Sequence, residues 1–95
     1  MADPRPASSV HATITEHGGM LLDLRGRGRW YALTASGALW WRHLTDGSTV
    51  DDAAAAVAGH YRADPDQVRA DMRVLAQQLY ERGMLRIPGR RRWLR

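Results

Sequence analysis

The sequence predicts an α+β fold in which a three-stranded antiparallel sheet is followed by three helices. Apolar residues alternate with a period of two up to Leu33, and from Thr34 onward they recur with the 3.6-residue period of a helix. With 95 residues, 44% of them hydrophobic and 25% charged, the chain fits one domain with a folded core. We expect this domain at residues 10–87, between a disordered lead-in (residues 1–9) and a basic tail (residues 88–95).

Three segments in the first third of the chain favour strands, because they are rich in β-branched or alternating apolar residues. They are residues 10–15, 20–24 and 29–33. Glycine-rich turns separate them, so a meander of consecutive antiparallel strands is the simplest arrangement. In the second segment, alternation places Asp23 on one face of the sheet and three apolar side chains on the other: Met20, Leu22 and Leu24.

Capping residues mark the ends of the first two helices. The first begins after Thr34 or Ser36 as N-cap and ends at the turn of residues 46–47, and the second begins after Ser48 or Thr49. Apolar residues at helical spacing indicate the buried faces. On the first helix these are Leu39, Trp40 and Leu44, and on the second Val50, Ala53, Ala54, Val57 and Tyr61.

The third helix has the clearest boundaries. Asp64 is its predicted N-cap, and Gly83 ends the helix. Pro65 suits the first helical position, because an N–H at that position would have no partner within the helix. Its apolar positions are Val68, Met72, Leu75 and Leu79. A winged helix-turn-helix outline results, in which the second and third helices stand behind a small sheet.

Residue types exclude several classes of function. The chain has no cysteine, which excludes disulfides, thiolate zinc sites and a cysteine nucleophile. No apolar run is long enough to span a membrane, so we expect a cytoplasmic protein without a membrane partner. The four histidines fall on four different predicted elements, without metal-site spacing or a neighbouring nucleophile. We therefore expect no enzyme activity, no metal and no cofactor.

A winged helix-turn-helix protein that binds DNA is the alternative, given the net charge of +4. A recognition helix presents its N-terminal residues to bases and phosphates. Here that end carries Asp64, Asp66 and Asp71, which phosphates would repel. Four of the arginines, Arg90, Arg91, Arg92 and Arg95, lie in the tail instead. The charge distribution thus argues against nucleic acid as the partner of this helix.

Three tryptophans are candidates for an exposed surface. Trp40 and Trp41 are adjacent on the first helix, so we expect that they cannot both point into the same core. Trp30 alternates with Tyr31 on the third strand, so these two side chains lie on opposite faces of the sheet. Exposed aromatic area is typical of interfaces, although a partly covered surface tryptophan is an equal alternative.

The stretch MLLDLRGRGRWYALTASGALWWRHLTDGSTVDD (residues 20–52), then Tyr61 and the ending ERGMLRI (residues 81–87), resembles the PqqD-like family. Members are recognition elements for the precursors of ribosomally made, post-translationally modified peptides. The similarity is a diffuse pattern of apolar and turn positions: Tyr31, Leu33, Gly37, Leu39, Asp46, Gly47 and Thr49.

A chain of this size is most similar to the stand-alone recognition proteins of lasso-peptide pathways, called B1. The resemblance implies a non-catalytic adaptor that binds the leader segment of a precursor peptide by β-strand addition. It also implies two partner enzymes, a leader peptidase of the cysteine-protease type and an ATP-dependent cyclase. The version that serves pyrroloquinoline quinone biosynthesis is the alternative within the family.

The resemblance places the leader on the third strand, at Arg29, Trp30, Tyr31, Ala32 and Leu33. In a meander this strand has one free edge, whose N–H and C=O groups an extended peptide can pair with. Each bond contributes only about 0.5–1.5 kcal/mol net, so side-chain anchors must add to the affinity.

We expect these anchors in a groove between the third strand and the third helix. The helical wheel favours one flank of that helix, with Met72 and Ala76 shaping the groove and Arg69 and Arg73 steering acidic leader residues. The predicted contacts are Val68, Arg69, Met72, Arg73, Ala76 and Tyr80. The opposite flank, with Asp71 and Gln78, is the alternative.

Overall fold

The structure, a computed structural model, describes residues 3–25 and 29–88. Its central sheet is antiparallel, with strands in the order β2 (Val10–Thr15), β3 (Gly18–Asp23) and β4 (Trp30–Leu33). Three helices follow: α1 (Ala35–Thr45), α2 (Val50–Tyr61) and α3 (Pro65–Glu81). A second, two-stranded sheet joins β1 (Arg5–Pro6) to β5 (Leu85–Arg86). The predicted α+β class, with three strands followed by three helices, is confirmed.

Each helix begins at a side chain that accepts a hydrogen bond from the first turn. Thr34 accepts from the N–H of Gly37, Thr49 from that of Asp52, and Asp64 from that of Asp66. Of the paired candidates, Thr34 and Thr49 are thus the N-caps. The turn of residues 46–47 ends α1, as predicted, and Arg62 ends α2 in the left-handed conformation with φ 54°.

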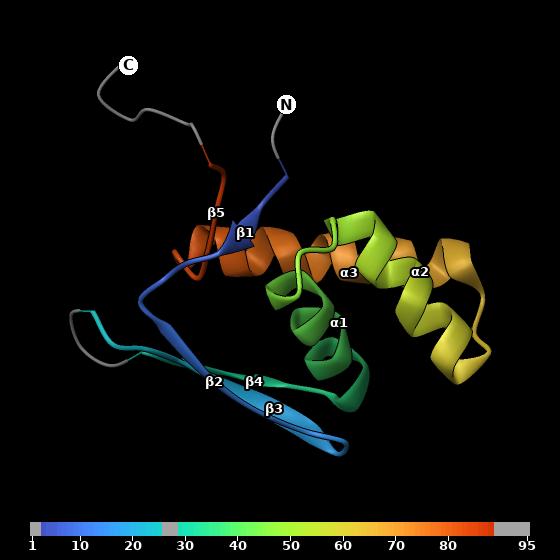
Figure 1. Cartoon of the computed structure of the whole chain (residues 1–95), viewed down its shortest axis with the longest axis horizontal. Coiled ribbons are helices and arrows are strands. Elements are labelled where there is room, and N and C mark those ends of the chain that lie inside the picture. Colours follow the sequence, from blue (N-terminus) through green and yellow to red (C-terminus); the bar gives the residue numbers. More distant parts are fainter. Residues whose placement is uncertain (1–2, 26–28, 89–95) are drawn as a thin grey trace.

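The helices cover one face of the central sheet. In Figure 1, α1 lies on the sheet, and α3 extends on the other side of α1 beside α2. One cluster forms the core, with Leu21, Trp40, Leu44, Ala53 and Leu79 fully buried at its centre. Gly19 lets α1 approach β3, since a Cβ there would lie 3.3 Å from the Cβ of Ala38.

The apolar face of β3 points away from this core. Alternation groups the side chains as predicted, but Leu21 and the carboxylate of Asp23 face the helices, while Met20 and Leu24 are 47% and 64% exposed. The helices therefore rest on the side of β3 that carries fewer large apolar residues, and β2 and β4 add Val10, Ile14 and Leu33 to this side of the sheet. The outer face is left with an apolar surface that the described part of the chain does not cover.

Both adjacent tryptophans of α1 are buried, contrary to our expectation. Trp40 is 0% and Trp41 2% exposed. They can both be buried because α1 is enclosed on several sides, by the central sheet, by α2 and by β1. The indole N–H of Trp40 donates to the carbonyl of Val50 at 3.2 Å, whereas the buried N–H of Trp41 has no partner among the described residues.

The N-terminal segment differs from the expected disordered lead-in. Residues 5–6 pair with β5, Ala7 is buried, and the N–H of Ala7 donates to the carbonyl of Met84 at 3.0 Å. The guanidinium of Arg5 donates to the carbonyl of Ser48 at 2.8 Å and to that of Leu44. The composition of residues 1–9, rich in prolines and small residues, predicts disorder. The hydrogen bonds that order this segment come from residues far along the chain, so the local sequence does not indicate them. Residues 89–95 of the predicted tail, with its four arginines, lie outside the described residues.

In the described ranges, 3–25 and 29–88, no helix is long and apolar enough to cross a membrane.

Candidate functional site

The β4 strand lies at the edge of the central sheet, with β3 as its one neighbour in that sheet. The N–H of Asp23 donates to the carbonyl of Arg29 at 2.7 Å, which fixes the phase of the ladder. Hydrogen-bonded and non-bonded pairs alternate along an antiparallel pair of strands. From this phase and the register, the backbone groups of Tyr31 and Leu33 point toward β3.

The backbone groups of Trp30 and Ala32 therefore point toward the open edge. Both residues are exposed, and the side chain of Trp30 is 60% accessible on the outer face of the sheet. An incoming strand could pair with the N–H and C=O groups of both residues without displacing a bond within the protein. The edge predicted from the sequence thus exists, and its two usable positions are now identified.

On the inner face, β4 is bridged to α3 by side chains. The hydroxyl of Tyr31 donates to the side-chain oxygen of Gln78 at 2.6 Å. The guanidinium of Arg82 lies over the Tyr31 ring, 5.1 Å from its centroid, in a cation–π contact. Farther along, Leu75 approaches Gly37 at the start of α1. One side of α3, which carries Leu75, Gln78 and Arg82, therefore faces β4.

A pocket of about 410 Å³ lies where β4 ends. The first residues after β4, the end of α2 and the first half of α3 line it. Val57, Val68 and Met72 give it an apolar wall, and the exposed Tyr61 and Asp71 belong to its lining. Its volume lies within the range of about 300–1,000 Å³ that is typical of ligand sites.

The structure divides the predicted contacts on α3 into two groups. Val68 and Met72 line the pocket. Arg69 pairs with Asp66 of its own helix at 2.6 Å, and Ala76 is 8% exposed within the core. Tyr80 lines a different cavity, between α3 and β5.

The remaining predicted contact, Arg73, binds α2 instead of facing β4. Its guanidinium donates two hydrogen bonds to the carboxylate of Asp51, at 3.1 and 2.7 Å. These bonds are the main cause that lowers the pKa of Asp51 and raises that of Arg73. Arg73 therefore faces α2 and Tyr80 faces the cavity at β5, whereas Val68 and Met72 share the pocket with Asp71 of the alternative flank. Gln78 of that flank contacts β4.

The reason is the rotation of α3 about its axis. The buried stripe runs through Met72, Ala76 and Leu79, while Val68 and Leu75 are only half-buried. A wheel centred on the larger apolar residues gives Ala76 no weight as a core position, because its side chain is small. With Ala76 as a core position, the buried face of α3 is rotated toward Ala76, and Asp71 and Gln78 then lie on the side of the helix next to β4.

A buried carboxylate, that of Asp23, holds two arginines near the start of β4. Asp23 is 0% exposed and accepts a hydrogen bond from the N–H of Arg25 at 3.0 Å. Guanidinium nitrogens of Arg25 and Arg29 lie 3.7 and 3.5 Å from its oxygens. The Arg25 N–H is the largest cause that lowers the pKa of Asp23; burial opposes it, and Ser9 and the two guanidinium groups add to the lowering. The carboxylate thus fixes the base of the β3–β4 hairpin.

Metal binding and DNA binding have little support from the described residues. Across residues 3–25 and 29–88, no three histidine, aspartate or glutamate side chains are grouped closely enough to hold a metal ion. The start of α3 exposes the carboxylates of Asp64, Asp66 and Asp71, so the charge test against DNA applies to the folded surface as well.

Comparisons with known proteins agree with this architecture. The profile of the family described as coenzyme PQQ synthesis protein D (PqqD) matches residues 18–85. No curated protein matches the chain. A solved structure described as TbiB1 in complex with the TbiA(beta) leader peptide is 23% identical, with a TM-score of 0.76 over 92% of this chain and 98% of that one. A lasso peptide synthetase B1 complexed with the leader peptide is 28% identical, with a TM-score of 0.74 over 90% of this chain and 99% of that one.

Proposed function

The chain belongs to the PqqD family, whose profile spans residues 18–85, and on this premise we propose that it is a non-catalytic adaptor that binds the leader segment of a ribosomally made precursor peptide. The leader adds to β4 as a further strand. The open edge at Trp30 and Ala32 carries this proposal, because it offers unpaired backbone groups next to an apolar pocket. The similar B1 structures, which hold leader peptides, support it and favour a lasso-peptide precursor.

Backbone pairing alone gives this adaptor little affinity. Two outward-facing residues offer four hydrogen bonds, which contribute about 2–6 kcal/mol at about 0.5–1.5 kcal/mol each. Association and ordering of a peptide cost about 4–15 kcal/mol. An apolar leader side chain in the pocket beside Val68 and Met72 supplies the difference. Side chains, more than the strand itself, thus select the leader.

The charges beside β4 add a spacing rule for the leader. Asp71 lies at the pocket, and Arg82 follows it by eleven residues, or about 16 Å at about 1.5 Å per residue. An extended peptide covers this length in about five residues. Because both groups face the inner side of the added strand, the matching leader residues are an even number apart. A residue with a hydrogen-bond donor at the pocket and an acidic residue four or six positions away fit best.

The adaptor presents the bound leader to separate enzymes. In a lasso-peptide pathway these are a leader peptidase of the cysteine-protease type and an ATP-dependent cyclase. A second candidate is the corresponding role in pyrroloquinoline quinone biosynthesis, which the description of the matched family favours. The two roles differ in the peptide that is bound.

The test is a titration of labelled leader peptides against the ¹⁵N-labelled protein. A lasso precursor leader, the precursor peptide of pyrroloquinoline quinone synthesis and a random DNA duplex are compared at physiological salt. We expect the lasso leader to bind most tightly and to shift the amide signals of residues 30–33 and of Val68. Tighter binding of the quinone precursor selects the second candidate. Preference for DNA, or shifts remote from β4, contradicts leader binding by strand addition.

A further inference from the structure

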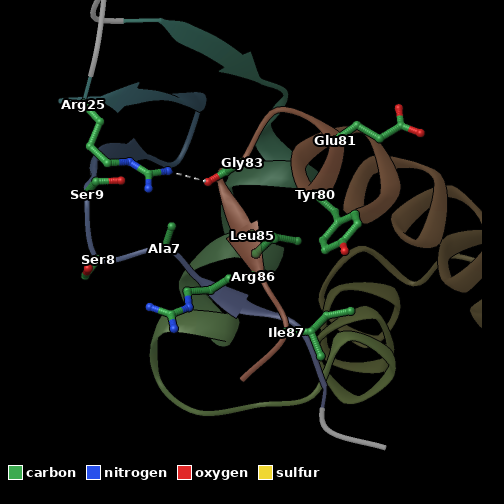
Figure 2. Close-up of a pocket in the computed structure, with 10 residues that line it drawn as sticks. All are labelled: Ala7, Ser8, Ser9, Arg25, Tyr80, Glu81, Gly83, Leu85, Arg86 and Ile87. Atoms are coloured by element: carbon green, nitrogen blue, oxygen red, sulfur yellow. Dashed lines mark hydrogen bonds between the residues drawn. The ribbon is translucent and has the colours of Figure 1, made fainter. Parts of the chain in front are cut away.

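A second cavity, which we call the β5 cavity, lies at the C-terminal end of α3. Its volume is about 480 Å³, and its walls come from the N-terminal segment, the base of the β3–β4 hairpin, the end of α3 and β5. Figure 2 shows how Ser9, Arg25, Tyr80, Arg86 and Ile87 surround it. Tyr80 and Glu81 of α3 line this cavity, whereas Gln78 and Arg82 turn toward β4. It is therefore separate from the strand-addition site.

Two guanidinium groups from opposite walls make this cavity positive. Arg25 is held in place by Asp23 and by the carbonyl of Gly83 at 3.4 Å, yet its side chain stays 62% exposed. Arg86 is exposed and makes no ion pair within the part of the chain that the structure describes. Glu81 is the one carboxylate of the lining, and Figure 2 shows it directed away from both arginines. An anion that reaches between Arg25 and Arg86 is thus favoured.

The rest of the lining selects the kind of anion. Tyr80 is 36% exposed and Ile87 is half-buried, so these two supply the apolar surface of the wall, while Leu85 and Ala7 of the lining are buried behind it. Such a wall suits a ligand that carries an apolar group beside its charge. A nucleic acid strand brings many phosphates and would set some of them against Glu81. An acidic residue beside an aliphatic one in a peptide matches both parts of the cavity.

We infer that the β5 cavity binds an acidic peptide segment of a partner protein. A carboxylate of the segment pairs with Arg25 and Arg86, and its apolar neighbour packs on Tyr80 and Ile87. Because the lining of this cavity shares no residue with β4 or with the pocket beside it, the acidic segment and a leader bind at the same time. The cavity thus gives the adaptor a second contact, through which an enzyme can be held beside the bound leader.

The probe is a fluorescein-labelled tetrapeptide that alternates glutamate and leucine, titrated against the full chain. We expect binding that weakens as ionic strength rises from 0.05 to 0.3 M, and amide shifts at residues 7–9, 25 and 80–87. The Arg86→Glu variant should bind at least tenfold more weakly. Arg62→Glu, with the same change of charge at the end of α2 and outside the cavity, should change affinity less than twofold. If Arg86→Glu alters the circular dichroism spectrum, Arg86→Gln takes its place, with Arg62→Gln as its matched control.

Three results would overturn the inference. Equal losses of affinity in Arg86→Glu and Arg62→Glu would show that the peptide responds to the net charge of the protein and not to the cavity. Shifts centred on residues 30–33 would place the peptide at the β4 edge. Displacement of the probe by equimolar inorganic phosphate, or by random DNA duplex, would show an anion or polyanion site without preference for a peptide carboxylate.

Discussion

Replacement of Ala32 by proline tests strand addition at the β4 edge most directly. From the ladder phase, the N–H of Ala32 points toward the open edge, so proline removes no hydrogen bond within the protein. Proline is tolerated on edge strands, and its restriction of the preceding residue to extended backbone suits Tyr31, which already lies in β4. We therefore expect Ala32→Pro to fold.

The expected loss of affinity follows from the missing donor. A leader carbonyl opposite Ala32 would be desolvated without a partner, at a cost of about 1–3 kcal/mol. This cost corresponds to about 5- to 150-fold weaker binding, since about 1.4 kcal/mol is a factor of ten. The pyrrolidine ring also projects from the edge into the space of the incoming strand, so the loss should lie toward the upper end of this range.

The assay is fluorescence polarisation with labelled leader, and a proline on the other edge of the same sheet is the matched control. The N–H of Leu24 donates to the carbonyl of Ser9 at 3.0 Å, and the same alternation then turns the backbone of Ala12 outward from β2. Ala12→Pro should leave leader affinity within twofold of the original protein. Unchanged affinity in a folded Ala32→Pro variant, or equal losses at the two edges, would refute strand addition to β4.

Three further predictions concern the pocket, the hairpin and the core. Val68→Glu should weaken leader binding at least tenfold in the same assay, whereas Val74→Glu, on the exposed side of α3, should not; equal effects would show that the pocket is not used. Trp40→Phe should lower the free energy of unfolding by about 0.5–1.5 kcal/mol more than Trp41→Phe in urea titrations, because only the first change removes a hydrogen bond within the protein; equal losses would contradict this. Asp23 has a lowered pKa in the fold, so its stabilising effect is present above its ordinary pKa and is lost as pH falls through the lowered value; the stability difference from Asp23→Asn should shrink as pH falls below the ordinary pKa, and a difference as large at pH 2 as at pH 7 would contradict a lowered pKa for Asp23.

Local signals in the sequence predict most of the fold. Threonine and aspartate caps, the proline at the start of α3 and the glycine-rich turns act within a few residues, so their structural effect can be read from short stretches. The open edge of β4 follows from the order of three consecutive strands. What the sequence does not reveal depends on distant partners. Arg73 binds Asp51 twenty-two residues away, and Arg5 reaches the turn between α1 and α2.

The rotation of α3 is the clearest example of this limit. A helical wheel states which residues share a side, but the direction of that side depends on the neighbouring helix. The small residues of α2, such as Ala53 and Ala54, are buried and allow α3 to approach so that Ala76 becomes a core position. Because of the same rotation, Arg69 and Arg73, the arginines predicted to steer the leader, point away from β4.

An open strand edge is a liability, because it can pair with any extended chain. In this protein β4 is only four residues long, and just two of its positions face outward. Arg29 precedes it, and Tyr31 is held by Gln78, so the strand is fixed in place before a peptide arrives. A short rigid edge lowers the ordering cost on the protein's side but provides too few bonds to hold an arbitrary peptide. Selectivity must then come from the pocket at the end of β4, where only a leader with a fitting side chain gains the remaining free energy.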